Sequence, residues 1–203
     1  MKLKDKQTED KIFEAATEVF LEKGMDGARM QEIADKAGIN KALLHYYYRT
    51  KDRLFDAVFA LIANQMFKKL TPVFDEKLTL EEKIRLFFKE HIAFLKKNPR
   101  LPIFILNEIN RNPERIKRII NSLNVKNMWL IVEKQHKDEL EKYNITQENI
   151  PQLITSIAAL SIFPFVAKPI ISAILGEIGA DYNDYINQRG DFAADFTIRA
   201  IRK

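Results

Sequence analysis

The stretch that decides the fold is AGINKALLHYYYRTKDRLF, which runs from Ala37 to Phe55. It places three consecutive tyrosines, Tyr46 to Tyr48, between a lysine upstream and an arginine and a lysine downstream. On a helix, neighbouring side chains point about 100° apart, so the three phenols cannot share one face. We therefore expect at least one tyrosine in the core and at least one on the surface.

The residues before the tyrosines predict two short helices joined by a tight turn. Ile33, Ala34 and Ala37 form an apolar stripe that stops at Gly38, and another helix begins after Asn40, a good N-cap residue. The GIN connection is too short for an antiparallel pair of helices, and a glycine-containing turn of this size is typical of a helix-turn-helix. Gly38 can adopt the backbone conformation that a side chain would resist.

Helical patterns flank this motif on both sides. An apolar stripe upstream predicts a first helix, which Thr8 can cap and Gly24 can end, and Thr50 caps a fourth helix that runs through Ile62. The stripe recurs at i, i+3, i+4, i+7 and i+8 and consists of Ile12, Ala15, Ala16, Val19 and Phe20.

The rest of the chain also reads as helical, without an alternating strand pattern. Thr79 and Glu82 form a capping box that opens a helix ending at Lys97, and Pro164 should bend or end the helix in which it lies. Further helices are expected from Asn112 onward and over 127–143, 150–175 and 183–203. The predicted fold class is all-α, with a helix-turn-helix domain over residues 1–53 and a larger helical domain over 54–203.

Composition excludes several function classes. The 203 residues contain no cysteine, so disulfides, thiolate nucleophiles and cysteine zinc sites are excluded. The sequence has no glycine-rich phosphate loop and no HExxH or GxSxG pattern, so we expect neither an enzyme nor a cofactor or metal site. The longest apolar stretch is broken by Pro164, Lys168 and Pro169, and no secretory segment is evident, which predicts a cytoplasmic protein without membrane contact.

The N-terminal segment from Thr8 to Phe55 resembles the DNA-binding domain of the TetR family of bacterial transcriptional regulators. The resemblance rests on IFEAATEVFLEKG and IADKAGINKALLHYYYRTKDRLF at the spacing of that family. It implies a recognition helix in the major groove, with Leu44 and Tyr48 packed inward. The DNA-binding residues that we infer, for base edges or phosphates, are Arg29, Lys41, Ala42, Leu43, His45, Tyr46, Tyr47, Thr50 and Lys51.

The sequence departs from the family pattern at positions that affect operator choice. Ala28 and Arg29 stand where the family has a capping hydroxyl, and Arg29 can instead reach a phosphate. Leu43 and His45 replace a small hydroxyl residue and a tyrosine at base-reading positions, so no operator sequence can be carried over. The alternative for this segment taken alone is a solvated, basic and amphipathic helix face.

The central helices contain an apolar stripe with a histidine inside it. The family resemblance implies that a small effector binds in a cavity among these helices. Such a lone histidine is otherwise a satisfied core residue. Trp129 and His136 fall seven residues apart on one face of a later helix. The ligand-binding residues that we infer for a small, largely apolar effector are Phe87, Phe88, His91, Phe104, Asn107, Trp129 and His136.

The basic segment from Lys96 to Arg118 has three interpretations. It can be a second nucleic-acid contact, a site for an anionic ligand, or a solvated surface at the end of a helix. Lys96 and Lys97 complement the dipole of the helix that they end, which favours the solvated surface.

The last two helices combine small and apolar residues in LITSIAALSIFPFV and DFAADFTIRAI. The resemblance implies that they form a four-helix dimer interface, and the alternative is an intramolecular core. The interface residues that we infer are Ile157, Ala159, Leu160, Phe192 and Phe196. The function expected from all of this is a ligand-responsive repressor that binds a palindromic double-stranded DNA operator as a homodimer. The rival is an all-helical adaptor without sequence-specific DNA binding.

Overall fold

The computed structural model describes residues 3–114, 117, 121 and 125–202. Within these ranges every regular element is a helix and no strand is present, which confirms the all-α prediction. The helix expected from Asn112 falls mostly on residues outside the described ranges. No single described helix is long and apolar enough to cross a membrane; the helices Ile150–Val166 and Lys168–Glu177 have that length and composition only as a pair bent by 75°.

The chain folds into two compact units. The N-terminal unit contains Met1–Gln65 with Phe104–Arg115, and the C-terminal unit contains Met66–Ile103 with Ile116–Lys203. This division differs from the expected one between residues 53 and 54, because residues 54–65 and the segment Phe104–Arg115 group with the N-terminal unit.

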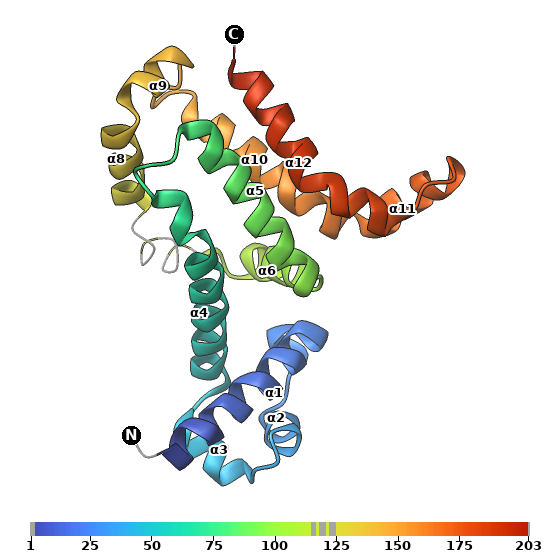
Figure 1. Ribbon diagram of the computed structural model, residues 1–203. Helices are drawn as coiled ribbons and strands as arrows, with labels where there is room; N and C mark the ends of the chain where they lie inside the picture. The colour runs from blue at the N-terminus through green and yellow to red at the C-terminus, as the bar shows by residue number, and fades with distance from the viewer. Residues whose placement is uncertain (1–2, 115–116, 118–120, 122–124, 203) are drawn as a thin grey trace. The chain divides into compact units, whose positions relative to one another are not determined.

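The N-terminal unit is built from α1 (Leu3–Gly27), α2 (Met30–Lys36), α3 (Lys41–Tyr47) and the first part of α4 (Lys51–Leu70) (Figure 1). Gly24 has a positive φ of 67° and kinks α1, where the sequence predicted the helix to end. The core of the unit is apolar and includes the rings of Phe20 and Phe55, whose centroids lie 5.0 Å apart. Its fully buried side chains include Ile12, Val19, Ile33, Leu44, Leu54 and Val58.

The second part of α6 (Leu101–Arg111) belongs to the same unit. The ring of Phe104 is buried 5.6 Å from the ring of Phe55, and Arg111 Nη1 lies 3.3 Å from the carboxylate of Asp26. A segment about fifty residues away in sequence therefore completes the N-terminal core.

The C-terminal unit is organised around α5 (Leu80–Lys97), which packs against α12 (Tyr182–Ile201), α10 (Ile150–Val166) and the 3-10 helix η1 (Thr71–Phe74) (Figure 1). The capping box predicted for α5 is confirmed, with Thr79 and Glu82 bonded to each other's backbone N–H groups. The remaining helices are α8 (Val125–Gln135), α9 (Lys137–Lys142) and α11 (Lys168–Glu177).

Two helices expected to be continuous are interrupted. The helix predicted over 127–143 breaks at His136, whose imidazole bonds to Glu139 at 2.6 Å while the same carboxylate accepts from the Leu80 N–H at the start of α5. The helix predicted over 150–175 breaks at Ala167, and α11 begins at Lys168 with Pro169 in its first turn.

Of the two outcomes expected at Pro164, a bend or an end, the helix does not end there: α10 continues to Val166, because neighbouring groups satisfy the carbonyl that lacks its hydrogen bond to proline. The carbonyl of Leu160, four residues earlier, accepts a hydrogen bond from Arg189 Nε at 3.0 Å. The carbonyl of Pro164 itself accepts from the Tyr182 hydroxyl at 3.0 Å. Both donors come from α12, so the proline ties α10 to α12.

Candidate functional site

The turn between α2 and α3 has the geometry that the sequence predicts. Gly38 has a φ of 66°, and the Asn40 side chain accepts a hydrogen bond from the Leu43 N–H at 2.7 Å. At the start of α4 the Thr50 hydroxyl accepts from the Arg53 N–H at 3.2 Å. Arg29 occupies the N-cap of α2 without a side-chain cap, as its sequence predicts. These caps fix the direction in which α3 presents its side chains.

Most side chains of α3 face outward. Leu44 is fully buried and anchors the helix, whereas Tyr46 is 81% exposed. An exposed face with so few apolar anchors is available for a partner. Its exposed side chains are Lys41, Ala42, Leu43, His45 and Tyr46.

The three tyrosines divide as expected. Tyr48 turns inward, where its ring meets Phe13 edge-on at 5.8 Å and its hydroxyl donates to the Glu9 carboxylate at 3.1 Å. Burial and the neighbouring Glu9 raise the pKa of Tyr48 above its usual value. Tyr47 is half-buried with its ring against that of Tyr46 at 5.7 Å. Tyr48 therefore serves the core, and Tyr46 exposes most of its side chain to solvent.

Lys51 has a structural role that sequence reasoning missed. Its Nζ donates to the carbonyl oxygens of Asp26 at 3.2 Å and Ala28 at 3.0 Å, at the end of α1. An ammonium group has three donors, so one remains for a phosphate. Arg49 and Arg53 are exposed beside it and form no ion pair with a described residue, so they extend the basic surface.

The C-terminal unit contains an apolar cavity of about 320 Å³. Two of the residues predicted for the effector, Phe87 and Trp129, lie in its wall. The cavity is lined by Val73, Phe74, Leu80, Lys83, Ile84, Phe87, Trp129, Val132, Ile150, Ile154, Ile157 and Ala158. Its volume lies at the lower end of the range of about 300–1,000 Å³ for small-molecule pockets.

The other predicted effector residues lie outside this wall. Phe88 is fully buried in the core, and His136 is paired with Glu139. His91 bonds to the Ser161 hydroxyl, and burial lowers its pKa to about 4. Phe104 packs in the N-terminal unit, and Asn107 is exposed there. Spacing along one helix therefore identified the element but not every side chain that faces the cavity.

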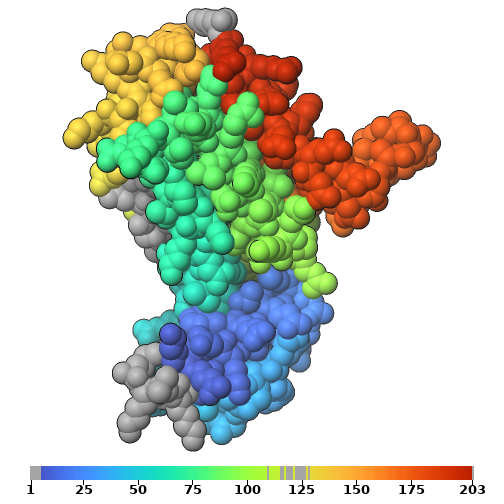
Figure 2. All heavy atoms as spheres, in the orientation of Figure 1, coloured from blue at the N-terminus to red at the C-terminus, as the bar shows by residue number. Residues whose placement is uncertain are grey.

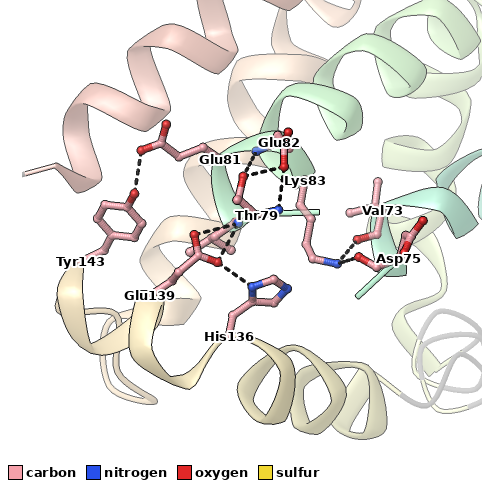
Figure 3. Close-up of polar contacts among 10 residues, drawn as sticks. Val73, Asp75, Thr79, Glu81, Glu82, Lys83, His136, Glu139 and Tyr143 are labelled. Carbon is pink, nitrogen blue, oxygen red and sulfur yellow. Dashed lines mark hydrogen bonds and ion pairs between the residues drawn. The ribbon is translucent and has the colours of Figure 1, made fainter. Parts of the chain in front are cut away.

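A frame of polar contacts supports one end of the cavity (Figure 3). Lys83 is buried, and its Nζ donates to the carbonyls of Val73 at 2.8 Å and Asp75 at 2.6 Å. Burial lowers the pKa of this lysine. Glu81 accepts from the Tyr143 hydroxyl at 2.6 Å and from Arg202, and these bonds lower its pKa to about 2. Within the described residues, no group of three His, Asp or Glu side chains is arranged to hold a metal ion.

The residues of α10 and α12 that were predicted for a dimer interface differ in their exposure to solvent. Ala159, Phe192 and Phe196 are exposed, and the two phenylalanine rings stack at 6.3 Å. Ile157 lines the cavity, and Leu160 is partly buried against the core of its own unit.

Comparison with known proteins agrees with this geometry. Residues 12–58 match the family described as bacterial regulatory proteins, tetR family. The chain is 24% identical over 171 residues to the probable HTH-type transcriptional regulator YttP of Bacillus subtilis, covering 83% of this chain and 82% of YttP. It is 25% identical over 112 residues to the fatty acid metabolism regulator protein of the same organism, covering 55% of this chain and 58% of that protein.

A solved structure shares the fold over nearly the whole chain. The TetR-like transcriptional regulator from Rhodococcus sp. RHA1 superposes with a TM-score of 0.66 at 21% identity, covering 96% of this chain and 95% of its own. The family match spans most of α1, the helix-turn-helix formed by α2 and α3, and the start of α4. The structural likeness includes the helical C-terminal unit. Residues 12–58 therefore belong to the DNA-binding domain of the tetR family of bacterial regulatory proteins, and the whole chain has the fold of TetR-like regulators.

Proposed function

We propose that this regulator is a cytoplasmic repressor that binds a palindromic operator as a homodimer and is released by a small, largely apolar molecule. The observation that carries the proposal is the apolar cavity of about 320 Å³ in the C-terminal unit of a chain whose N-terminal unit exposes a helix-turn-helix. The protein acts by binding and not by catalysis.

The exposed residues of α3 and the start of α4 support a distinction between side chains that contact bases and side chains that contact phosphates. Lys41, Leu43 and His45 lie on the exposed face of α3 and are proposed to read base edges in the major groove. Arg49, Lys51 and Arg53 are proposed to contact phosphates, together with Arg29, Tyr46, Tyr47 and Thr50. A single seven-residue helix makes few contacts, so a two-fold dimer that presents two copies of α3 accounts better for specificity.

The cavity favours an effector with an apolar body. Apart from Lys83, whose ammonium group is engaged by backbone carbonyls, its walls are aliphatic and aromatic. Burial of apolar surface would then supply most of the binding free energy. The similarity to a fatty acid metabolism regulator supports acyl chains as the first class to test.

The coupling between effector and operator must be energetic. A ligand that binds both states equally shifts nothing, and a 100-fold loss of operator affinity requires a preference of about 2.8 kcal/mol for the state that does not bind DNA. Linkage requires the operator to weaken effector binding by the same factor.

The test begins with selection of bound duplexes from a random pool, which would report DNA binding, half-site symmetry and spacing together. Fatty acids of increasing chain length are then added to the complex, and duplex affinity is followed by fluorescence anisotropy. We expect Ala158→Leu, which fills the cavity, to reduce the effector response while leaving operator affinity unchanged. Ala200→Leu adds the same side chain at an exposed position and serves as the control.

Two results would separate the parts of the proposal. If the protein binds DNA specifically but no apolar molecule alters that binding, the proposed effector response is wrong and the proposed operator binding stands. Absence of any selected sequence would favour the adaptor alternative.

A further inference from the structure

A second hollow in the C-terminal unit lies between α5 and α12, away from the apolar cavity. This groove has a volume of about 690 Å³. Ala93 and Gly190 contribute little or no side chain, which leaves room above the buried residues Ile92 and Ile186. The groove is lined by Lys89, Ile92, Ala93, Lys96, Lys97, Ile186, Asn187, Gly190 and Asp191.

The groove is basic at its rim. Three lysines, Lys89, Lys96 and Lys97, face one acid, Asp191. Lys96 donates to the side chain of Asn187, and neither Lys89 nor Lys97 forms an ion pair with a described residue. Three neighbouring cations against one anion leave a positive potential over a partly apolar floor, which suits a partner that is both acidic and apolar.

The chain itself carries a segment of that chemistry. Helix α11 and the turn after it extend away from the body of the C-terminal unit (Figure 2). Ile170, Ile174 and Ile178 are 64%, 59% and 73% exposed, and their i, i+4, i+8 spacing places them on one side of the segment. Glu177 and Asp184 are exposed nearby without an ion pair to a described residue. We call Lys168 to Asp184 the arm.

The arm does not fill the groove of its own chain, because its isoleucines are exposed and the groove is open. We propose that the arm of one copy docks in the Lys89, Lys96 and Lys97 groove of a second copy. The arm would place its isoleucines over the apolar floor and its carboxylates beside the lysines. This inference rests on the proposed homodimer, in which two-fold symmetry gives two equivalent arm and groove contacts.

The docking also gives a role to Lys96 and Lys97 at the start of the basic segment. These two lysines are not among the residues proposed to contact DNA. An exposed row of three isoleucines is unfavourable in water, and its burial against a partner would stabilise the dimer. The lysines would add specificity and faster association more than affinity.

A charge-reversal pair tests this contact. The groove variant is Lys96→Glu with Lys97→Glu, and the arm variant is Glu177→Lys with Asp184→Lys; Asp181 is unchanged because it caps α12. Each variant alone should weaken dimerisation at least tenfold in low salt, measured by sedimentation velocity. In an equal mixture, both arm and groove contacts match only in the heterodimer. Native mass spectrometry should therefore find heterodimers in clear excess over the statistical half.

Lys68→Glu with Lys69→Glu reverses two exposed lysines at the end of α4 and should leave dimerisation unchanged. Circular dichroism checks that each variant folds. If the Lys96→Glu with Lys97→Glu variant does not fold, Lys96→Gln with Lys97→Gln takes its place, and the expected loss of dimer affinity is then smaller. Wild-type-like dimerisation of both variants, or a statistical mixture, would overturn the arm contact while leaving the homodimer intact. Normal dimerisation with lost affinity for DNA or inorganic phosphate would assign the groove to anions instead. A wild-type monomer at micromolar concentration would overturn both the homodimer and the arm contact.

Discussion

Nδ1 of His91 lies 3.1 Å from the hydroxyl oxygen of Ser161, and both side chains are buried where α5 meets α10. The Ser161 hydroxyl can donate to the carbonyl of Ile157 or Ala158, each 3.0 Å away, which leaves a lone pair for the imidazole N–H. The histidine therefore has a partner within the core.

This buried histidine predicts a loss of stability in mild acid. Burial lowers the folded pKa of His91 from 6.5 to about 4, so the unfolded chain takes up the proton first as the pH falls. The stabilisation by the neutral ring is complete above pH 6.5 and is lost between pH 6.5 and about 4, at up to about 1.4 kcal/mol per pH unit.

Urea unfolding of the wild type and of His91→Leu at several pH values would measure this slope. The variant should lose the part of the pH dependence that comes from His91 and keep its effector response. Ser161→Ala removes the partner without removing the titrating ring and is the matched control. An altered effector response at constant stability would instead support the sequence-based expectation that His91 contacts the ligand.

On DNA, Lys51 and Lys41 should behave differently. Lys51→Ala should weaken specific and nonspecific duplexes alike and reduce the salt slope by about one per subunit. It should also cost stability, because the carbonyls of Asp26 and Ala28 lose their donor. Lys41→Ala should relax the preference at one base position in each half-site by about 1–3 kcal/mol.

Anisotropy with operator and scrambled duplexes over a range of salt concentrations would separate the two effects. Lys68→Ala, at an exposed lysine outside the helix-turn-helix, should change neither quantity. Equal weakening of all duplexes by Lys41→Ala would remove Lys41 from the base-reading residues.

Charge placed on the exposed face of α10 and α12 should separate the dimer. Ala159→Asp and Phe196→Glu each put a carboxylate at a position that the two-fold interface would bury, so both should shift the protein to monomer and abolish operator binding. Sedimentation at micromolar concentration measures the first effect. Ile131→Glu, on the exposed side of α8, is the matched control, and an unchanged dimer in both test variants would relocate the interface.

The lysine in the cavity wall should be important for stability. Lys83→Met keeps most of the aliphatic stem but leaves the carbonyls of Val73 and Asp75 without their donor, which should cost about 1–3 kcal/mol. Thermal unfolding compares this variant with Lys68→Met, at an exposed position of α4. Equal stability of the two variants would mean that water or a small backbone shift satisfies these carbonyls.

Local chemistry made three helix starts predictable from sequence, whereas Thr8, expected to cap the first helix, lies inside α1. Asn40, Thr50 and Thr79 each bond to a backbone N–H three residues later, so the signal lies within one turn. The break at His136 was not predictable in this way, because Glu139 also bonds to Leu80, about sixty residues away in sequence. The same holds for Phe104, whose place in the N-terminal core depends on a distant ring.

The two candidate sites also differ in how far they could be predicted from sequence. The exposed side of α3 follows from helical spacing around the single buried anchor Leu44. The cavity wall combines residues from η1, α5, α8 and α10, and the sequence alone gave no reason to join Val73 or Ile157 to Trp129. Residues that converge from several elements can be identified only once the packing is known.

The cavity also gives a way to search for the effector without knowing the operator. A molecule that binds only the folded protein stabilises it by about 2.7 kcal/mol when its concentration is 100 times its dissociation constant. Because every lining residue belongs to the C-terminal unit, this stabilisation acts on that unit. In a calorimetric scan, the melting transition of the C-terminal unit should therefore move upward by roughly 2–4 °C for each kcal/mol, while any separate transition of the helix-turn-helix unit stays in place.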